Sequence, residues 1–195
     1  MVAVKDEPVG TSAFMDNSDV EVDDDTFTIL LGTDIHLGHK KDDPVRWRDS
    51  FLAFEELLQH AKTNDVDFLL FGGDLFDENN PPVKVVKHAI RLLHENICGQ
   101  KPVKFTVISD AARNFGHSCP DTQDPHWLLP WINISYPVLS IHGNHDNPTG
   151  DTNLSAIDLL ATQGLLSHFG KLTELDKIVI EPVLLQKVYF KTIQW

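Results

Sequence analysis

The chain has 195 residues and a formal net charge of −13, a length that suits one domain with or without a tail. Its two cysteines exclude a disulfide scaffold and a cysteine-rich zinc site, and they fit a reducing compartment. No apolar run approaches the length of a transmembrane helix, and the first ten residues contain no apolar signal-peptide stretch, so we expect no membrane association. The acidic balance argues against binding polyanions by charge alone, so a nucleic-acid substrate requires another source of positive charge.

The first 25 residues differ from the rest of the chain. They hold eight acidic residues and one lysine, and they show no hydrophobic periodicity. This composition predicts an acidic disordered leader over residues 1–25, for which a solvated tail without a function of its own is the simplest interpretation. Residues 26–195 are then the folded domain.

Strand and helix patterns alternate along that domain. The apolar run 27–31, which ends at Gly32, predicts a buried strand, and the spacing of apolar residues over 44–63 predicts an amphipathic helix. Further strands are predicted at 66–71, 103–108 and 137–141, further helices at 83–97 and 153–163, and weaker strand patterns occupy 171–185 and 188–195. The alternation predicts an α/β fold with a mainly parallel sheet covered by helices.

An insertion at about residues 110–135 interrupts this order. It contains three prolines and the aromatic residues Phe115, Trp127 and Trp131. Long loops in compact domains are usually functional or disordered, and aromatic side chains are unusual in disordered ones. We therefore expect a partner-docking insertion in which these three aromatics make the contacts, although a surface loop packed on its own domain is an equally good interpretation.

Polar residues follow three of the predicted strands. Asp34 and His36 follow the first strand, Asp74 follows two glycines after the second, and Asn144 and His145 follow the strand at 137–141. Because ligands bind at the carboxyl ends of parallel strands, these side chains are expected to converge on one crevice. Asp34 and His36 are two residues apart, so an extended backbone would direct both to the same side.

This set of side chains suits divalent cations. Mixed oxygen and imidazole ligands favour manganese, iron or zinc over calcium. The two oxygens of Asp74 can bridge two cations, and a pair of cations about 3.5–4 Å apart can clamp a phosphoryl group and activate a water. His145 is placed to donate a proton to a leaving oxygen, and Asp146 is expected to orient its imidazole.

The segments that carry these residues resemble the first three motifs of the calcineurin-like metallophosphoesterases. They are Asp34-Ile35-His36-Leu37-Gly38, Gly73-Asp74-Leu75-Phe76 and Gly143-Asn144-His145-Asp146. Within that family the closer resemblance is to the double-strand-break repair nucleases of the Mre–Rad–Nbs complex. It rests on further segments at 66–68, 76–79, 114–116, 147–150 and 167–170, and it covers about residues 26–187.

The resemblance implies a fold and an activity. The fold is a two-layer sandwich of mixed β-sheets flanked by helices, with two manganese ions. Motif matching implies that Asp34 and His36 ligate one ion, Asp74 bridges both, Asn144 ligates the second and His145 assists catalysis. Members cut DNA as exonucleases and endonucleases in the nucleus. They dimerise through the helices that follow the first two motifs, and they bind the Rad ATPase and the Nbs subunit. In eukaryotic members the insertion is where the loop that contacts Nbs lies.

The chain also departs from the family pattern. The family's metal site includes three later histidines, with a His-x-His pair among them, which do not follow here before Trp195. We therefore expect a C-terminally incomplete domain with weak metal binding and little nuclease activity; a fragment, a splice form and an incomplete gene model are the alternatives. A catalytically silent adaptor for dimerisation and Nbs binding is the competing function. A protein phosphatase is disfavoured, because Glu78-Asn79-Asn80 stands where those enzymes carry Asp-Arg-Gly.

Overall fold

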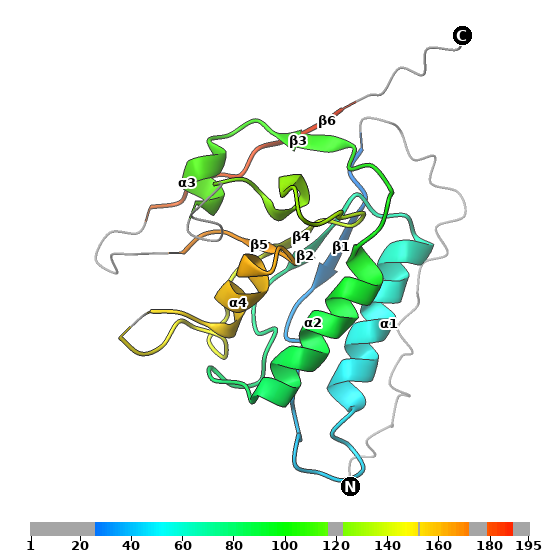
Figure 1. Ribbon diagram of the computed structural model, residues 1–195, viewed down its shortest axis with the longest axis vertical. Helices are drawn as coiled ribbons and strands as arrows, with labels where there is room; N and C mark the ends of the chain where they lie inside the picture. Colours follow the sequence, from blue (N-terminus) through cyan, green and yellow to red (C-terminus); the bar gives the residue numbers. More distant parts are fainter. Residues whose placement is uncertain (1–25, 117–122, 152, 172–178, 189–195) are drawn as a thin grey trace, which may run out of the picture.

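The computed structural model describes residues 26–116, 123–151, 153–171 and 179–188 (Figure 1). The leader at 1–25 and the strand patterns at 172–178 and 189–195 lie outside the described residues. The strands are β1 (Ile29–Gly32), β2 (Phe68–Phe71), β3 (Phe105–Val107), β4 (Val138–Ser140), β5 (Ser167–His168) and β6 (Leu185–Lys187). The helices are α1 (Asp49–Thr63), α2 (Val83–Ile97), α3 (Ala111–Phe115) and α4 (Ala156–Thr162), with a 3-10 turn at His126–Leu128.

Four strands form a parallel sheet in the order β1-β2-β4-β5. Its register pairs Gly32 with Phe71, Phe71 with Ser140, and Ser140 with His168. The carboxyl ends of all four strands therefore lie at one edge. Because β2 is a central strand, the residues that follow it lie between the loops that follow β1 and β4.

A second sheet and two helices cover opposite faces of the parallel sheet. Phe68 and Phe71 of β2 are three residues apart, so their side chains point to opposite faces. The ring of Phe71 packs 5.8 Å from that of Phe54 in α1, and the ring of Phe68 lies 5.5 Å from that of Phe105 in β3. Figure 1 shows α1 and α2 side by side. This arrangement confirms the predicted metallophosphoesterase fold, with two β layers flanked by helices.

The smaller sheet differs from the prediction. β3 pairs antiparallel with β6, with Phe105 opposite Lys187, and does not join the parallel sheet. The helix predicted from residue 44 begins at Asp49, because the Asp43 carboxylate accepts hydrogen bonds from the backbone N–H groups of Val45 and Arg46 and forms a turn instead. Within the described residues, no helix is both long enough and apolar enough to cross a membrane.

The structure corrects the expectation for two aromatics of the insertion. Phe115 is fully buried and Trp127 is 8% exposed, and their rings lie 6.2 Å apart. Trp127 also packs 5.2 Å from Phe105. Both rings therefore belong to the core, since burying large aromatic surfaces stabilises the fold more than exposing them. Trp131 is 58% exposed, so a docking role for the insertion stays a prediction that now depends on Trp131.

His126 links the insertion to the sheet and is a purely structural histidine. Its Nδ1 lies 2.9 Å from the Ser167 hydroxyl, and its Nε2 accepts a hydrogen bond from the backbone N–H of Val138. Complete burial lowers the pKa of His126 to about 3. The ring is thus neutral in the folded protein, with Nδ1 carrying the hydrogen.

We expect His126 to weaken the fold in acid. Since the pKa of this group is lower in the folded state than in the unfolded state, its contribution is complete above about pH 6.5 and is lost as the pH falls towards 3. Urea unfolding of the wild type and of His126→Gln at several pH values tests this. Across that range, the ratio of folded to unfolded protein should fall more steeply in the wild type, by up to about tenfold per pH unit. A difference between the two proteins that does not change with pH would contradict the assignment.

Candidate metal centre

The loops after β1 and β2 run alongside each other at the carboxyl edge of the sheet. The backbone N–H of Asp34 donates to the carbonyl of Gly73, and the N–H of His36 donates to the carbonyl of Asp74. These bonds continue the parallel pairing beyond the strands and fix the two loops at the same height. As a result, the side chains of Asp34, His36 and Asp74 have ligand atoms that all lie within 4.8 Å of one another.

The backbone that brings these residues together is not extended, which corrects one expectation. Asp34, His36 and Asp74 have φ angles of 54°, 50° and 52°, all in the left-handed region. Non-glycine residues rarely adopt this region, and such residues cluster at functional sites. Asp34 and His36 do face each other, with 4.0 Å between Asp34 Oδ1 and His36 Nε2, but turns rather than strand alternation place them there.

A second group of possible ligands includes a residue that sequence reasoning missed. His36, Asp77 and His145 also have ligand atoms within 4.8 Å of one another. Asp77 Oδ1 lies 3.2 Å from His36 Nδ1 and 3.3 Å from His39 Nδ1. The only signal in the sequence is a second carboxylate three residues after Asp74. Its meaning depends on how the chain turns after β2.

The loop after β4 wraps around Asp74. The backbone N–H of His145 donates to Asp74 Oδ1 over 2.8 Å. Asn144 lies in this turn and is exposed, and within the described residues its side chain makes no hydrogen bond. The structure thus brings Asp34, His36, Asp74 and His145 together, while the role of Asn144 as a ligand stays a prediction.

His145 is oriented by the backbone of Asp77. Its Nδ1 lies 2.7 Å from the Asp77 carbonyl oxygen, so this nitrogen carries a hydrogen and donates it. This hydrogen bond, followed by nearby carboxylates that include Asp74, raises the pKa of His145. The ring of His36 packs against that of His145 edge to face, with 4.8 Å between centroids. His145 therefore keeps Nε2 for proton exchange and favours its protonated form.

Asp146 holds the backbone through its hydrogen bonds, and its role in orienting the imidazole of His145 stays a prediction. It is almost fully buried, and its two oxygens accept from the N–H groups of Gly143 and Leu75 over 2.5 and 2.7 Å. Both hydrogen-bonding positions of the carboxylate are thus used to tie the loop after β4 to the loop after β2.

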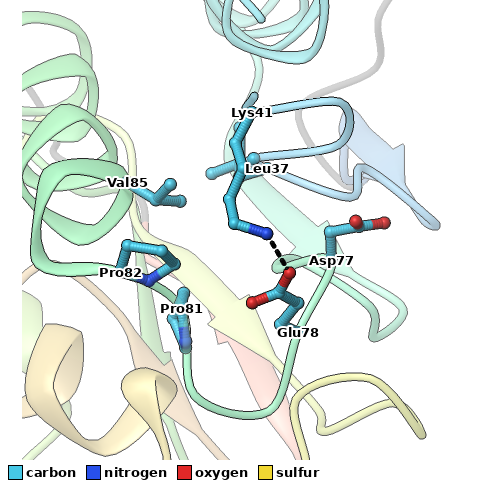
Figure 2. A pocket seen from close by; sticks show the side chains of 8 residues that line it. Leu37, Lys41, Asp77, Glu78, Pro81, Pro82 and Val85 are labelled. Atoms are coloured by element: carbon cyan, nitrogen blue, oxygen red, sulfur yellow. Dashed lines mark hydrogen bonds and ion pairs between the residues drawn. The ribbon is translucent and has the colours of Figure 1, made fainter. Parts of the chain in front are cut away.

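A small crevice opens beside Asp77 (Figure 2). Its walls include Leu37, Pro82 and Val85, and the Lys41 ammonium reaches across it to the Glu78 carboxylate. The space between these side chains, about 140 Å³, is continuous with open solvent, so the crevice is not an enclosed ligand pocket.

The side chains at this edge fit divalent cations. Asp34, Asp74 and Asp77 lie close together, and within the described part of the chain none of them pairs with a lysine or arginine. The Nδ1 atom of His36 is buried and faces the Asp77 carboxylate over 3.2 Å without a well-formed hydrogen bond. Clustered carboxylates without a lysine or arginine to balance them, next to an imidazole, are a donor set that suits manganese, iron or zinc.

The fold and this donor set define a metallophosphoesterase. Residues 27–187 match the family of calcineurin-like phosphoesterases, and the chain belongs to that family.

Among curated proteins it is 47% identical over 172 residues to the double-strand break repair protein MRE11 of Gallus gallus, a match that covers 85% of this chain and 23% of that relative. It is similarly 45% identical over 180 residues to MRE11 of Homo sapiens, with 89% and 24% of the two chains covered. For MRE11 of Arabidopsis thaliana the identity is 43% over 169 residues, with 84% and 23% covered. The chain therefore spans about a quarter of the length of these relatives.

Proposed function

We propose that this chain carries the catalytic metal centre of a manganese-dependent DNA nuclease that acts in double-strand break repair, as an exonuclease and a single-strand endonuclease. The observation that carries the proposal is the meeting of Asp34, His36 and Asp74 at one edge of the sheet, beside His145. The names of the relatives support DNA repair as the context. Divalent cations would also supply the positive charge that an acidic protein needs for contact with DNA phosphates.

Some of these residues would bind cations, and His145 would transfer a proton. Asp34 and His36 would hold one manganese ion, Asn144 the other, and Asp74 would bridge them. When bound there, manganese would supply polarisation of a phosphoryl oxygen and a lower pKa for a bound water. The Nε2–H of His145 donates a proton to the leaving oxygen of the phosphodiester, and the Asp77 carbonyl keeps the ring turned for this transfer.

The same proposal includes partners and location. Because the MRE11 relatives are named for double-strand break repair, we propose DNA, the Rad ATPase and the Nbs subunit as partners, a homodimer, and a nuclear location. Of the three aromatics first assigned to partner docking, Trp131 is the exposed one, so contact with Nbs would use Trp131.

The test is cleavage of single-stranded DNA by the purified chain in manganese, compared with His145→Gln. Cleavage should depend on manganese. Removing the proton donor should slow cleavage by about 10²–10⁴-fold. Manganese binding, followed by electron paramagnetic resonance, should not change. No cleavage at any manganese concentration, or equal cleavage by the variant, would overturn the proposed activity.

A further inference from the structure

A second polar cluster lies directly behind the loop that holds His145. It combines residues of the loop after β4, the start of α4 and the end of β5, elements that lie together in Figure 1. Its members are His142, Ser155, Asp158, His168 and Lys171. His168 is fully buried and Asp158 is 7% exposed, so their charges and hydrogen bonds are largely shielded from water.

Asp158 anchors this cluster. One oxygen, Oδ1, lies 2.9 Å from His168 Nε2 and 3.3 Å from the Lys171 ammonium. The other, Oδ2, accepts from the backbone N–H and the hydroxyl of Ser155 over 2.7 and 3.1 Å. The Lys171 ammonium already balances the buried carboxylate. This arrangement favours a structural role over a second metal site, although three of the members are metal-binding residue types.

His142 is held from two sides by groups that Asp158 orients. Its Nε2 lies 2.9 Å from the Ser155 hydroxyl, and its ring packs on the ring of His168 with 4.7 Å between centroids. Since the Ser155 hydroxyl gives its hydrogen to Asp158, the Nε2–H of His142 is the donor to Ser155. The position of His142 is thus fixed by hydrogen bonding through Nε2 and by an edge-to-face contact with the His168 ring.

The backbone after His142 has no room to move. Gly143 follows directly, and a Cβ atom added to Gly73 would lie 2.8 Å from Gly143 Cα. Two residues later, the N–H of His145 donates to Asp74 Oδ1. A shift of His142 would therefore also shift the Asp74 carboxylate and His145, because the backbone between them is tightly packed.

We propose that His142, held by Ser155 and by the His168 ring on Asp158, is a positioning residue for the metal centre, and that it presses the loop after β4 against Asp74. The proposal rests on the proposed function, because the loop it positions belongs to that centre. The support comes from residues that are not themselves proposed metal ligands.

The test removes one support of His142 and leaves α4 intact. Ser155→Gly deletes the hydroxyl that His142 contacts, and glycine replaces serine at a helix N-cap at little cost. We expect this variant to bind Mn²⁺ about tenfold more weakly than the wild type, as measured from the electron paramagnetic resonance of free Mn²⁺. Ser155→Thr, which keeps the hydroxyl, should restore wild-type affinity.

The matched control is Thr162→Val in the same helix. It removes a hydroxyl that bonds to the backbone carbonyl of Asp158 and does not contact His142, so Mn²⁺ affinity should stay at the wild-type value. Equal affinity of Ser155→Gly and wild type, a failure of threonine to rescue, or an equal loss in Thr162→Val would overturn the positioning role. If the wild type binds no Mn²⁺, or if Asp74→Asn leaves binding unchanged, the metal centre itself fails and the positioning role falls with it.

Discussion

Asp74→Asn is expected to abolish manganese-dependent cleavage of DNA and to weaken Mn²⁺ binding more than any other single substitution in this chain. Asp74 follows a central strand, lies between the loops after β1 and β4, and groups with both Asp34 and His36. If Asp74 bridges two cations as proposed, losing its charge should lower the rate by at least about 10³-fold, equivalent to several kcal/mol of transition-state stabilisation.

The asparagine variant separates metal binding from folding. Asparagine keeps the oxygen that can accept the N–H of His145, so the loop after β4 should remain in place and the unfolding temperature should change little. Mn²⁺ titration of the two proteins at equal concentration, together with single-turnover cleavage, gives both quantities. Asp42→Asn is a suitable control, because Asp42 is exposed and contacts Lys41 rather than the centre. Wild-type Mn²⁺ affinity in Asp74→Asn would refute the assignment of Asp74 as the bridging ligand.

The ends of the strands could be predicted from the sequence because they depend on local patterns. The apolar runs before Gly32 and Gly72 mark parallel strands, and α2 occupies the predicted residues 83–97. The expectation that the first strand is buried was wrong, because β1 is an edge strand in which Leu31 is 63% exposed. Parallel strands must end at a common edge, so the convergence of Asp34 and Asp74 followed from their places after those strands. These conclusions needed no information on packing between distant segments.

The parts that could not be predicted depend on contacts between distant residues. β3 pairs with β6 across about 80 residues of chain, and short strands of three residues carry almost no pattern of their own. The burial of Phe115 and Trp127 depends on packing near the same second sheet. Local sequence patterns do not predict that packing. The left-handed backbone at Asp34 and His36 is imposed by hydrogen bonds to the neighbouring loop. The hydrophobic periodicity of a sequence carries no information about such hydrogen bonds.

Asp77 shows the same limit at the centre itself. Its carboxylate approaches His36 and its carbonyl holds His145, yet these two partners lie on opposite sides of it in the sequence. A single aspartate after a strand is commonplace, so only the folded loop reveals that one residue serves two histidines.

Gly143→Ala is expected to damage both the fold and the metal centre. A Cβ atom at this position would collide with the side-chain oxygen Oδ1 and with the backbone nitrogen of Asp74. Neither atom can move freely, because Asp74 Oδ1 accepts from His145 and the loop before Asp74 packs against Gly143. Forcing a methyl group into such a place costs about 2–3 kcal/mol. For a chain of this size that lowers the unfolding temperature by about 5–10 °C.

The same collision should remove Mn²⁺ binding at temperatures where the variant is still folded, since the methyl group would displace the Asp74 carboxylate. Gly32→Ala is the matched control. Its new Cβ would meet the flexible end of the Leu57 side chain at 3.2 Å and the Phe71 ring at 3.5 Å, outside the centre, so a small loss of stability with unchanged Mn²⁺ affinity is expected. Thermal unfolding followed by circular dichroism and Mn²⁺ titration below the transition give the two readouts. If Gly143→Ala retains wild-type Mn²⁺ affinity, the loop after β4 does not press on Asp74 as the structure requires.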